Sequence, residues 1–109
     1  MGDLLSRING PENIGNGNTD VFTGTGGHTY TIRNTRIINN TAAAITVKLG
    51  IGATGAVADT ELILGPVSIP ASGGLLNHDC FIVMSGTENL KANATATGTT
   101  ITISGLDQS

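Results

Sequence analysis

Apolar and polar residues alternate most regularly in the segment ITVKLGI, which spans residues 45–51. A period of two places Thr46 and Lys48 on one face of an extended chain and the apolar residues on the other. The pattern predicts a β-strand with one buried side and one solvent-facing side. The apolar positions are Ile45, Val47, Leu49 and Ile51.

The same period recurs along most of the chain after residue 27. Residues 28–41 (HTYTIRNTRIINNT) begin with this alternation and then place polar residues at inward positions near 34–36, which predicts a bulge. Residues 90–96 and 101–103 repeat the alternation. About seven or eight short strands, with turn signals roughly every 8–12 residues, predict an all-β chain that folds as a small antiparallel sandwich or jelly-roll-like domain.

Residues 1–27 have a different character. They contain seven glycines, four asparagines and Pro11, with isolated apolar residues between them. Glycine, asparagine and proline in such numbers interrupt regular structure. We therefore expect residues 1–27 to form an extended N-terminal arm or long loop, and residues 28–109 to form the sandwich domain.

The stretch GIGATG, residues 50–55, matches the G-x-G-x-x-G pattern of dinucleotide-binding proteins. That fingerprint needs a helix at its third glycine and an acidic residue about 20 positions further on. Pro66 leaves room for only a short helix, and Asp59 and Glu61 come too early. We therefore interpret these glycines as a turn that takes the chain from one sheet to the other, and we expect no nucleotide cofactor.

The segment NHDCF, residues 77–81, brings a histidine, a carboxylate and the single cysteine together in sequence. Neighbours on a strand point to opposite faces, so these side chains do not converge as a nucleophile, a base and an orienting group. His28 could complete a metal site, but the spacing is not that of common zinc sites. We interpret the segment as a polar loop followed by a buried Cys80. We expect no catalytic residues, no metal and no cofactor.

Composition and charge narrow the function classes. Glycine and threonine occur 16 times each among 109 residues, which favours strands and turns. The five basic residues form no cluster that could neutralise a run of phosphates, so we expect no nucleic-acid partner. No segment approaches about 18 continuous apolar residues, so we expect no membrane insertion. Ten of the apolar residues are alanines, and this thin core favours an oligomer or a larger assembly.

Three segments carry a resemblance to a known type of protein. Residues 30–52 (YTIRNTRIINNTAAAITVKLGIG), 64–76 (LGPVSIPASGGLL) and 81–107 (FIVMSGTENLKANATATGTTITISGLD) follow each other in a familiar order. This order resembles small virion structural proteins of tailed bacteriophages, of the β-sandwich capsid decoration (cement) type. The likeness spans about Thr29 to Leu106. The chain departs from the pattern at residues 86–89, where it is one residue longer.

The resemblance implies a non-enzymatic virion protein, made in the cytoplasm of a bacterial host, that binds the outer surface of the assembled head and stabilises it. It implies the major capsid protein as a partner, and self-association as a homotrimer. The flexible composition of residues 1–27 makes their apolar residues candidates for partner binding, by docking in a groove or adding a strand to a sheet edge. These candidates are Leu4, Leu5, Ile8 and Ile14.

A second placement in the particle is a component of the tail, neck or fibre base, with a receptor- or glycan-binding role. Sugar rings stack on exposed aromatic side chains, and the chain has only three aromatic residues. Apolar neighbours lead us to expect two of them, Tyr30 and Phe81, inside the domain. The decoration role is therefore the stronger expectation.

Overall fold

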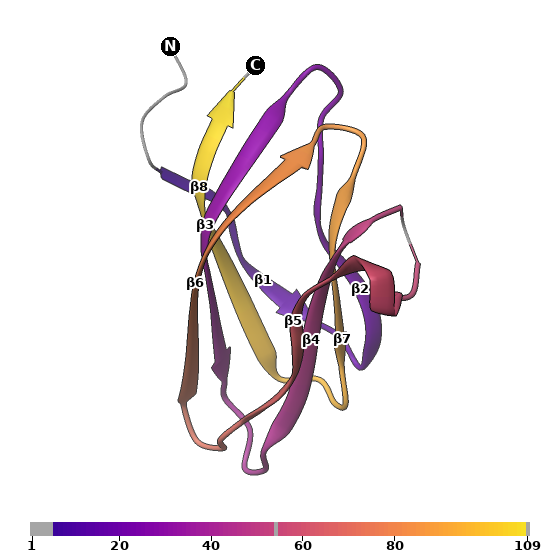
Figure 1. Ribbon diagram of the computed structural model, residues 1–109. Helices are drawn as coiled ribbons and strands as arrows, with labels where there is room; N and C mark the ends of the chain where they lie inside the picture. Colours follow the sequence, from indigo (N-terminus) through magenta and orange to yellow (C-terminus); the bar gives the residue numbers. More distant parts are fainter. Residues whose placement is uncertain (1–5, 54, 109) are drawn as a thin grey trace.

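The computed structural model describes residues 6–53 and 55–108, which form two antiparallel four-stranded sheets packed face to face (Figure 1). The predicted all-β sandwich is confirmed. A single 3-10 turn, η1 (Asp59–Glu61), precedes the fifth strand. The strands in chain order are β1 (Ser6–Ile14), β2 (Gly17–Thr23), β3 (Thr29–Asn39), β4 (Ile45–Gly52), β5 (Leu62–Ile69), β6 (Gly74–Ser85), β7 (Asn89–Ala94) and β8 (Thr99–Gln108).

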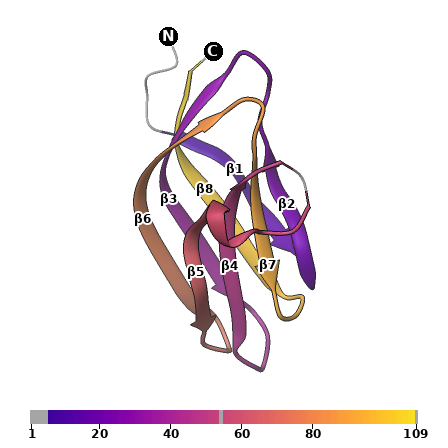
Figure 2. The same cartoon turned by 45° about the vertical axis from the view of Figure 1, so that its right-hand side comes forward.

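The strand order places four strands at sheet edges. Sheet I has the order β1-β8-β3-β6, and sheet II has the order β2-β7-β4-β5. All pairings are antiparallel, and the first strand pairs with the last, with Ser6 opposite Gly105. β1 contacts β2 along one side of the sandwich, and β5 contacts β6 along the other (Figure 2). The sandwich therefore has two open sides, each formed by one edge strand from each sheet.

One apolar core fills the space between the sheets. The inward phase of β4, which the sequence predicted, is buried at Ile45, Val47 and Leu49, whereas Ile51 is half-buried. Burying one such side chain contributes about 1.5–3 kcal/mol relative to leaving it exposed. The remaining core residues come from seven strands: Ile14, Val21, Tyr30, Ile32, Ile37, Ile69, Met84, Leu90, Ala92, Ala94, Ile101 and Ile103.

The predicted bulge in the third strand lies slightly earlier than expected. The pairing of β3 with both of its neighbours shifts register between Ile32 and Asn34. Relative to β8, β3 has one extra residue here, and this residue reverses the inside–outside phase of β3, because side chains alternate along a strand. Ile37 is consequently buried, whereas Ile38 faces outward and is half-buried.

The expectation of an N-terminal arm or loop is wrong for residues 6–23. These residues form β1 in sheet I and β2 in sheet II, so the fold does not begin at residue 28. β1 accommodates Pro11 because it is an edge strand, where a missing N–H interrupts no second pairing. Register shifts between Arg7 and Asn9 and between Asn9 and Glu12 allow the segment around Pro11 to remain paired with β8. Local composition was therefore outweighed by pairing with β8 and β7.

One predicted interruption is also wrong. The Asn77–Phe81 segment is not a loop, because β6 runs through it with an unbroken inside–outside alternation over 12 residues. Gly65-Pro66 likewise lies within a strand, because β5 continues to Ile69 as an edge strand. Both segments pair on one side only, with β3 and β4 respectively, and this tolerates residues that a central strand would not.

Candidate functional site

The glycines of the G-x-G-x-x-G stretch make room for a loop that folds back over sheet II. A Cβ at Gly50 would lie 2.7 Å from Val57 Cγ1, and a Cβ at Gly52 would overlap the Glu61 carboxylate. Both glycines lie in β4, on the face turned away from the core. The segment between β4 and β5 therefore rests directly on the sheet (Figure 2). The expectation of a crossing between sheets is wrong, since β5 pairs with β4 in the same sheet.

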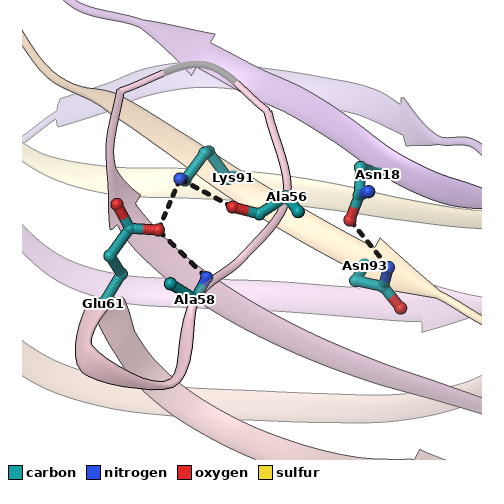
Figure 3. A network of polar contacts seen from close by, with 6 residues as sticks. All are labelled: Asn18, Ala56, Ala58, Glu61, Lys91 and Asn93. Atoms are coloured by element: carbon teal, nitrogen blue, oxygen red, sulfur yellow. Dashed lines mark hydrogen bonds and ion pairs between the residues drawn. The ribbon is translucent and has the colours of Figure 1, made fainter.

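Beneath this loop lies the most deeply buried charge of the described chain. Lys91 is directly opposite Gly50 on the neighbouring strand β7, and its side chain is 2% exposed. Its Nζ donates hydrogen bonds to Glu61 Oε1 at 2.5 Å and to the Ala56 carbonyl at 3.0 Å (Figure 3). The Ala58 N–H donates to the same Glu61 oxygen at 3.1 Å. Lys91 thus ties both arms of the loop to sheet II.

The contacts of Glu61 favour its charged form. The hydrogen bond from Lys91, followed by that from the Ala58 backbone, lowers the pKa of the Glu61 carboxyl. A carboxylate held in this way accepts hydrogen bonds and does not act as an acid near neutral pH. The Lys91–Glu61 pair is therefore a structural clip that holds the loop on the sheet.

The residues of the NHDCF segment diverge, as the strand geometry requires. Asn77 and Asp79 face outward on β6, whereas His78 and Cys80 face the core side. Partial burial, together with the nearby Asp79 carboxylate, raises the pKa of the Cys80 thiol, which disfavours the reactive thiolate. Cys80 is half-buried, not buried as predicted. His28 lies elsewhere, with its Nδ1 2.7 Å from Asp107 Oδ1.

No group of three potential metal ligands occurs among residues 6–53 and 55–108. Within the same residues, no helix is long and apolar enough to cross a membrane.

The outer face of β6 carries the large apolar side chains that the fold leaves exposed. Leu75, Phe81 and Val83 are 48%, 69% and 58% exposed, and we call them the β6 stripe. The Arg33 guanidinium lies over the Phe81 ring, 5.1 Å from its centre, as in a cation–π contact. The expectation that Phe81 is internal is wrong, because the aromatic ring falls on the outward phase of the strand. Tyr30 is internal as expected.

The middle of the same face is polar and ordered. Asn34 on β3 donates through Nδ2 to Asn77 Oδ1 at 2.7 Å and to Asp79 Oδ1 at 2.8 Å. These contacts hold two side chains of β6 in place between the apolar ends of the stripe. The face of β6 therefore presents a fixed sequence of apolar, polar and apolar groups.

Two of the four residues predicted to bind a partner lie in or against the core. Ile14 is 1% exposed and belongs to the core, and Ile8 is half-buried and packs against it. Leu4 and Leu5 lie outside the described residues. Because β1 is paired with β8, Ile8 and Ile14 serve the fold and are not available as anchors on a free arm.

The β6 stripe was missed because its strand was divided at a supposed polar loop. One signal in the sequence pointed to it. Residues 75–76 and 81–84 are apolar on both phases of the strand, and only one phase can face the core. An apolar outer phase on an edge strand is typical of an interaction surface.

No family model, no curated protein and no solved structure matched the chain in the comparisons with known proteins. Function is therefore inferred from the chain's own residues and from their arrangement.

Proposed function

We propose that the protein is a non-enzymatic structural component of a tailed-phage virion that binds the outer surface of the assembled head as a decoration protein. The observation that carries the proposal is the β6 stripe. Leu75, Phe81 and Val83 expose apolar surface along one edge strand of the domain. Such a domain is suited to contacts with other proteins.

The proposed action is stabilisation by mass action. A protein that binds the assembled head but not its separated subunits stabilises the assembly by about 2.7 kcal/mol per site at a hundredfold excess over the dissociation constant. The major capsid protein is the proposed partner, in contact with a homotrimer of this chain. Many equivalent sites on one head would multiply the effect.

The role proposed for the N-terminal segment is now confined to its first residues. Removal of residues 1–20 would delete β1 and half of β2, so that variant tests folding and not docking. Deletion of residues 2–5 removes Leu4 and Leu5 and leaves every described strand intact. We expect this shorter variant to keep the circular dichroism spectrum of the full chain. Loss of head binding would then assign docking to these residues, and unchanged binding would exclude them.

The decisive experiment is the number of copies per particle. Quantitative gel staining of purified virions, scaled to the major capsid protein, should give hundreds of copies for a protein that covers the head. About a dozen copies would contradict the decoration role and support the tail, neck or fibre base. Absence from purified virions would remove both placements.

Receptor or glycan binding at a tail tip is the second candidate function. It is favoured by one observation, the exposed Phe81 ring with Arg33 above it, which offers an aromatic surface next to a donor group. A glycan array probed with the purified protein tests it. Binding that is lost in Phe81→Ala but kept in Phe22→Ala would support this candidate over decoration.

A further inference from the structure

Three of the four edge strands carry features that prevent pairing with another chain. β1 contains Pro11 and two register shifts, and β5 contains Pro66 and two register shifts. β2 has seven residues and a register shift between Asp20 and Phe22. Prolines, bulges and short length are the usual means by which proteins protect sheet edges. The protection on these three strands makes the fourth edge conspicuous.

β6 is the longest of the four edge strands, and its pairing with β3 carries a single register shift, where Asp79–Ile82 lies opposite Ile32–Asn34. It spans 12 residues without proline and keeps its alternation throughout, and its only partner among the described strands is β3. One row of backbone N–H and C=O groups along β6 therefore faces away from sheet I. A long edge without proline and with this exposed row is a template for an additional strand.

The side chains of β6 also lack cover on both faces. On the outer face the β6 stripe is exposed. On the inner face Leu76, Cys80 and Ile82 are only half-buried, although they point toward the core side. A strand added beside β6 would cover apolar groups on both faces at once. Burial of this kind supplies the main favourable term in protein association.

We propose that β6 pairs antiparallel with β6 of a second copy of this chain, about a two-fold axis that passes through His78. The contact is isologous, because the same strand is used by both copies. It would join the two copies of sheet I into one continuous eight-stranded sheet. The proposal concerns the free protein and does not depend on the proposed role in a virion.

The polarity of the side chains selects this register. In an antiparallel pair with His78 on the axis, the sequence numbers of opposite residues add up to 156. Leu75 then lies opposite Phe81 of the second copy, and Asn77 lies opposite Asp79, with each pair occurring twice. Apolar groups meet apolar groups, and an amide donor meets a carboxylate, which are favourable cross-strand pairs. Asn77 accepts from Asn34 through Oδ1, so its Nδ2 can donate to the opposite carboxylate.

The neighbouring registers are less favourable. An axis through Asp79 would set two carboxylates directly opposite each other, which is destabilising. An axis through Cys80 would set Asp79 opposite Phe81, and would place the carboxylate against an aromatic ring in place of the Asn77 amide of the second copy. Directly opposite residues must share a face, so these are the next registers that the strand geometry allows in that direction.

A two-fold contact does not close a trimer. A three-fold contact, as proposed for the decoration role, would use another surface of the sandwich, and the two contacts together would give a hexamer. The masses of these states differ, so each contact can be followed separately. Failure of the β6 contact would leave the head-binding proposal intact, and the converse also holds.

The first test measures the mass of the purified protein over a range of concentrations by light scattering after gel filtration. We expect a dimer or a hexamer, and we expect Phe81→Lys to raise the dissociation constant of the two-fold contact at least tenfold. The matched control is Ser68→Lys, which places the same charge on the exposed face of the other edge strand of that open side. It should leave the mass unchanged. Thermal unfolding of both variants shows whether the fold is retained.

Two outcomes of this measurement overturn the proposal. One is a monomer or a trimer at every concentration up to the millimolar range. The other is a dimer or hexamer that Phe81→Lys and Ser68→Lys affect equally.

The second test fixes the register by cross-linking. In a Cys80→Ser background, His78→Cys places two thiols opposite each other at the axis, within reach of a disulfide. We expect a covalent dimer on a non-reducing gel after mild oxidation. Leu76→Cys in the same background is the control, because its two copies would be about 13 Å apart along the strands. A cross-link through native Cys80 in the unmodified chain would overturn the His78 register.

Discussion

The two outer faces of the sandwich are covered in opposite ways. On sheet II, Gly50 and Gly52 leave a flat area, and the chain's own loop fills it through Val57 and the Lys91–Glu61 clip. On sheet I, no comparable loop covers the β6 stripe among the described residues. The outer face of sheet II is therefore covered by the chain itself, whereas the outer face of sheet I leaves the β6 stripe for another molecule to cover.

This difference separates residues that maintain the fold from residues that are available for binding. Burial of a lysine lowers the stability of a fold unless its charge is paired. The outer face of sheet II therefore depends on the loop that brings Glu61 to Lys91. An exposed aromatic residue on an edge strand contributes little to the fold of a single copy. Substitutions on the two faces should accordingly have unequal effects on stability.

The largest effect is expected from Lys91→Ala. The substitution removes a buried side chain and, with it, the ammonium donor to the Glu61 carboxylate and to the Ala56 carbonyl. We expect the free energy of unfolding to fall by about 2–4 kcal/mol, as for other large-to-small changes at buried positions. Urea denaturation followed by circular dichroism measures it. Lys48→Ala is the control, since this half-exposed lysine lies on the same outer face of sheet II, on β4. Equal losses of stability in the two variants would contradict the role of Lys91 as a clip.

The next largest effect is expected from Gly50→Val. The new side chain would overlap Val57 and approach the Glu61 carbonyl, so the loop would have to move off the sheet. We expect a loss of about 1–3 kcal/mol, the usual cost of overpacking. Gly65→Val in β5 is the matched control because nothing lies within 4 Å of its Cβ position. Equal melting temperatures for the two variants would show that the loop does not depend on Gly50.

A smaller effect is expected from acid. The pKa of Glu61 is lowered in the folded protein, so its contribution to stability is complete above about pH 4.3, the usual value in an unfolded chain, and is lost as the pH falls through the lowered pKa. The effect is limited because Glu61 is 25% exposed. The difference in the free energy of unfolding between the natural chain and Glu61→Gln should therefore become smaller as the pH falls below about 5. A constant difference over that range would exclude the titration of Glu61 as its cause.

The smallest effect is expected from Phe81→Ala at concentrations where the protein is monomeric. Phe81 is 69% exposed, so its removal should change the free energy of unfolding by less than about 0.5 kcal/mol. Phe22→Ala is the comparison, because this half-buried ring packs edge-on against Tyr30 with ring centres 4.9 Å apart. It should cost at least about 1 kcal/mol. A large loss from Phe81→Ala would place this residue among those that maintain the fold.

The sequence predicted strands best where one clear phase is apolar and faces the core. β4 and β8 show this, with Leu49 and Ile103 buried on the predicted phases. Alternation alone determines which side of such a strand is buried. The sandwich class, the bulge in β3 and the interior position of Tyr30 follow from the same reasoning.

The elements that the sequence did not predict depend on pairing between distant segments, which local composition does not encode. Gly10 and Pro11 disfavour regular structure locally, yet pairing with β8 makes this segment a strand. The polar residues of NHDCF, such as Asp79, resemble a turn, but they lie on the outer face of an edge strand. The role of Gly50 could not be predicted, because its reason is a loop that folds back onto it. The β6 stripe could not be predicted once the NHDCF segment was interpreted as a loop, because the stripe lies on both sides of that segment in one strand.

The pairing of the first strand with the last has a consequence for synthesis of the protein. Among the described strands, the sheet partner of β1 (Ser6–Ile14) is β8 (Thr99–Gln108), about 90 residues further along the sequence. Contacts between residues so far apart in sequence slow folding, since a long loop must close before they form. Sheet I cannot be completed while β8 is still inside the ribosome. Sheet I therefore reaches its native form only after β8 has left the ribosome, and until then the edge of the sheet at β6 is open to neighbouring nascent chains.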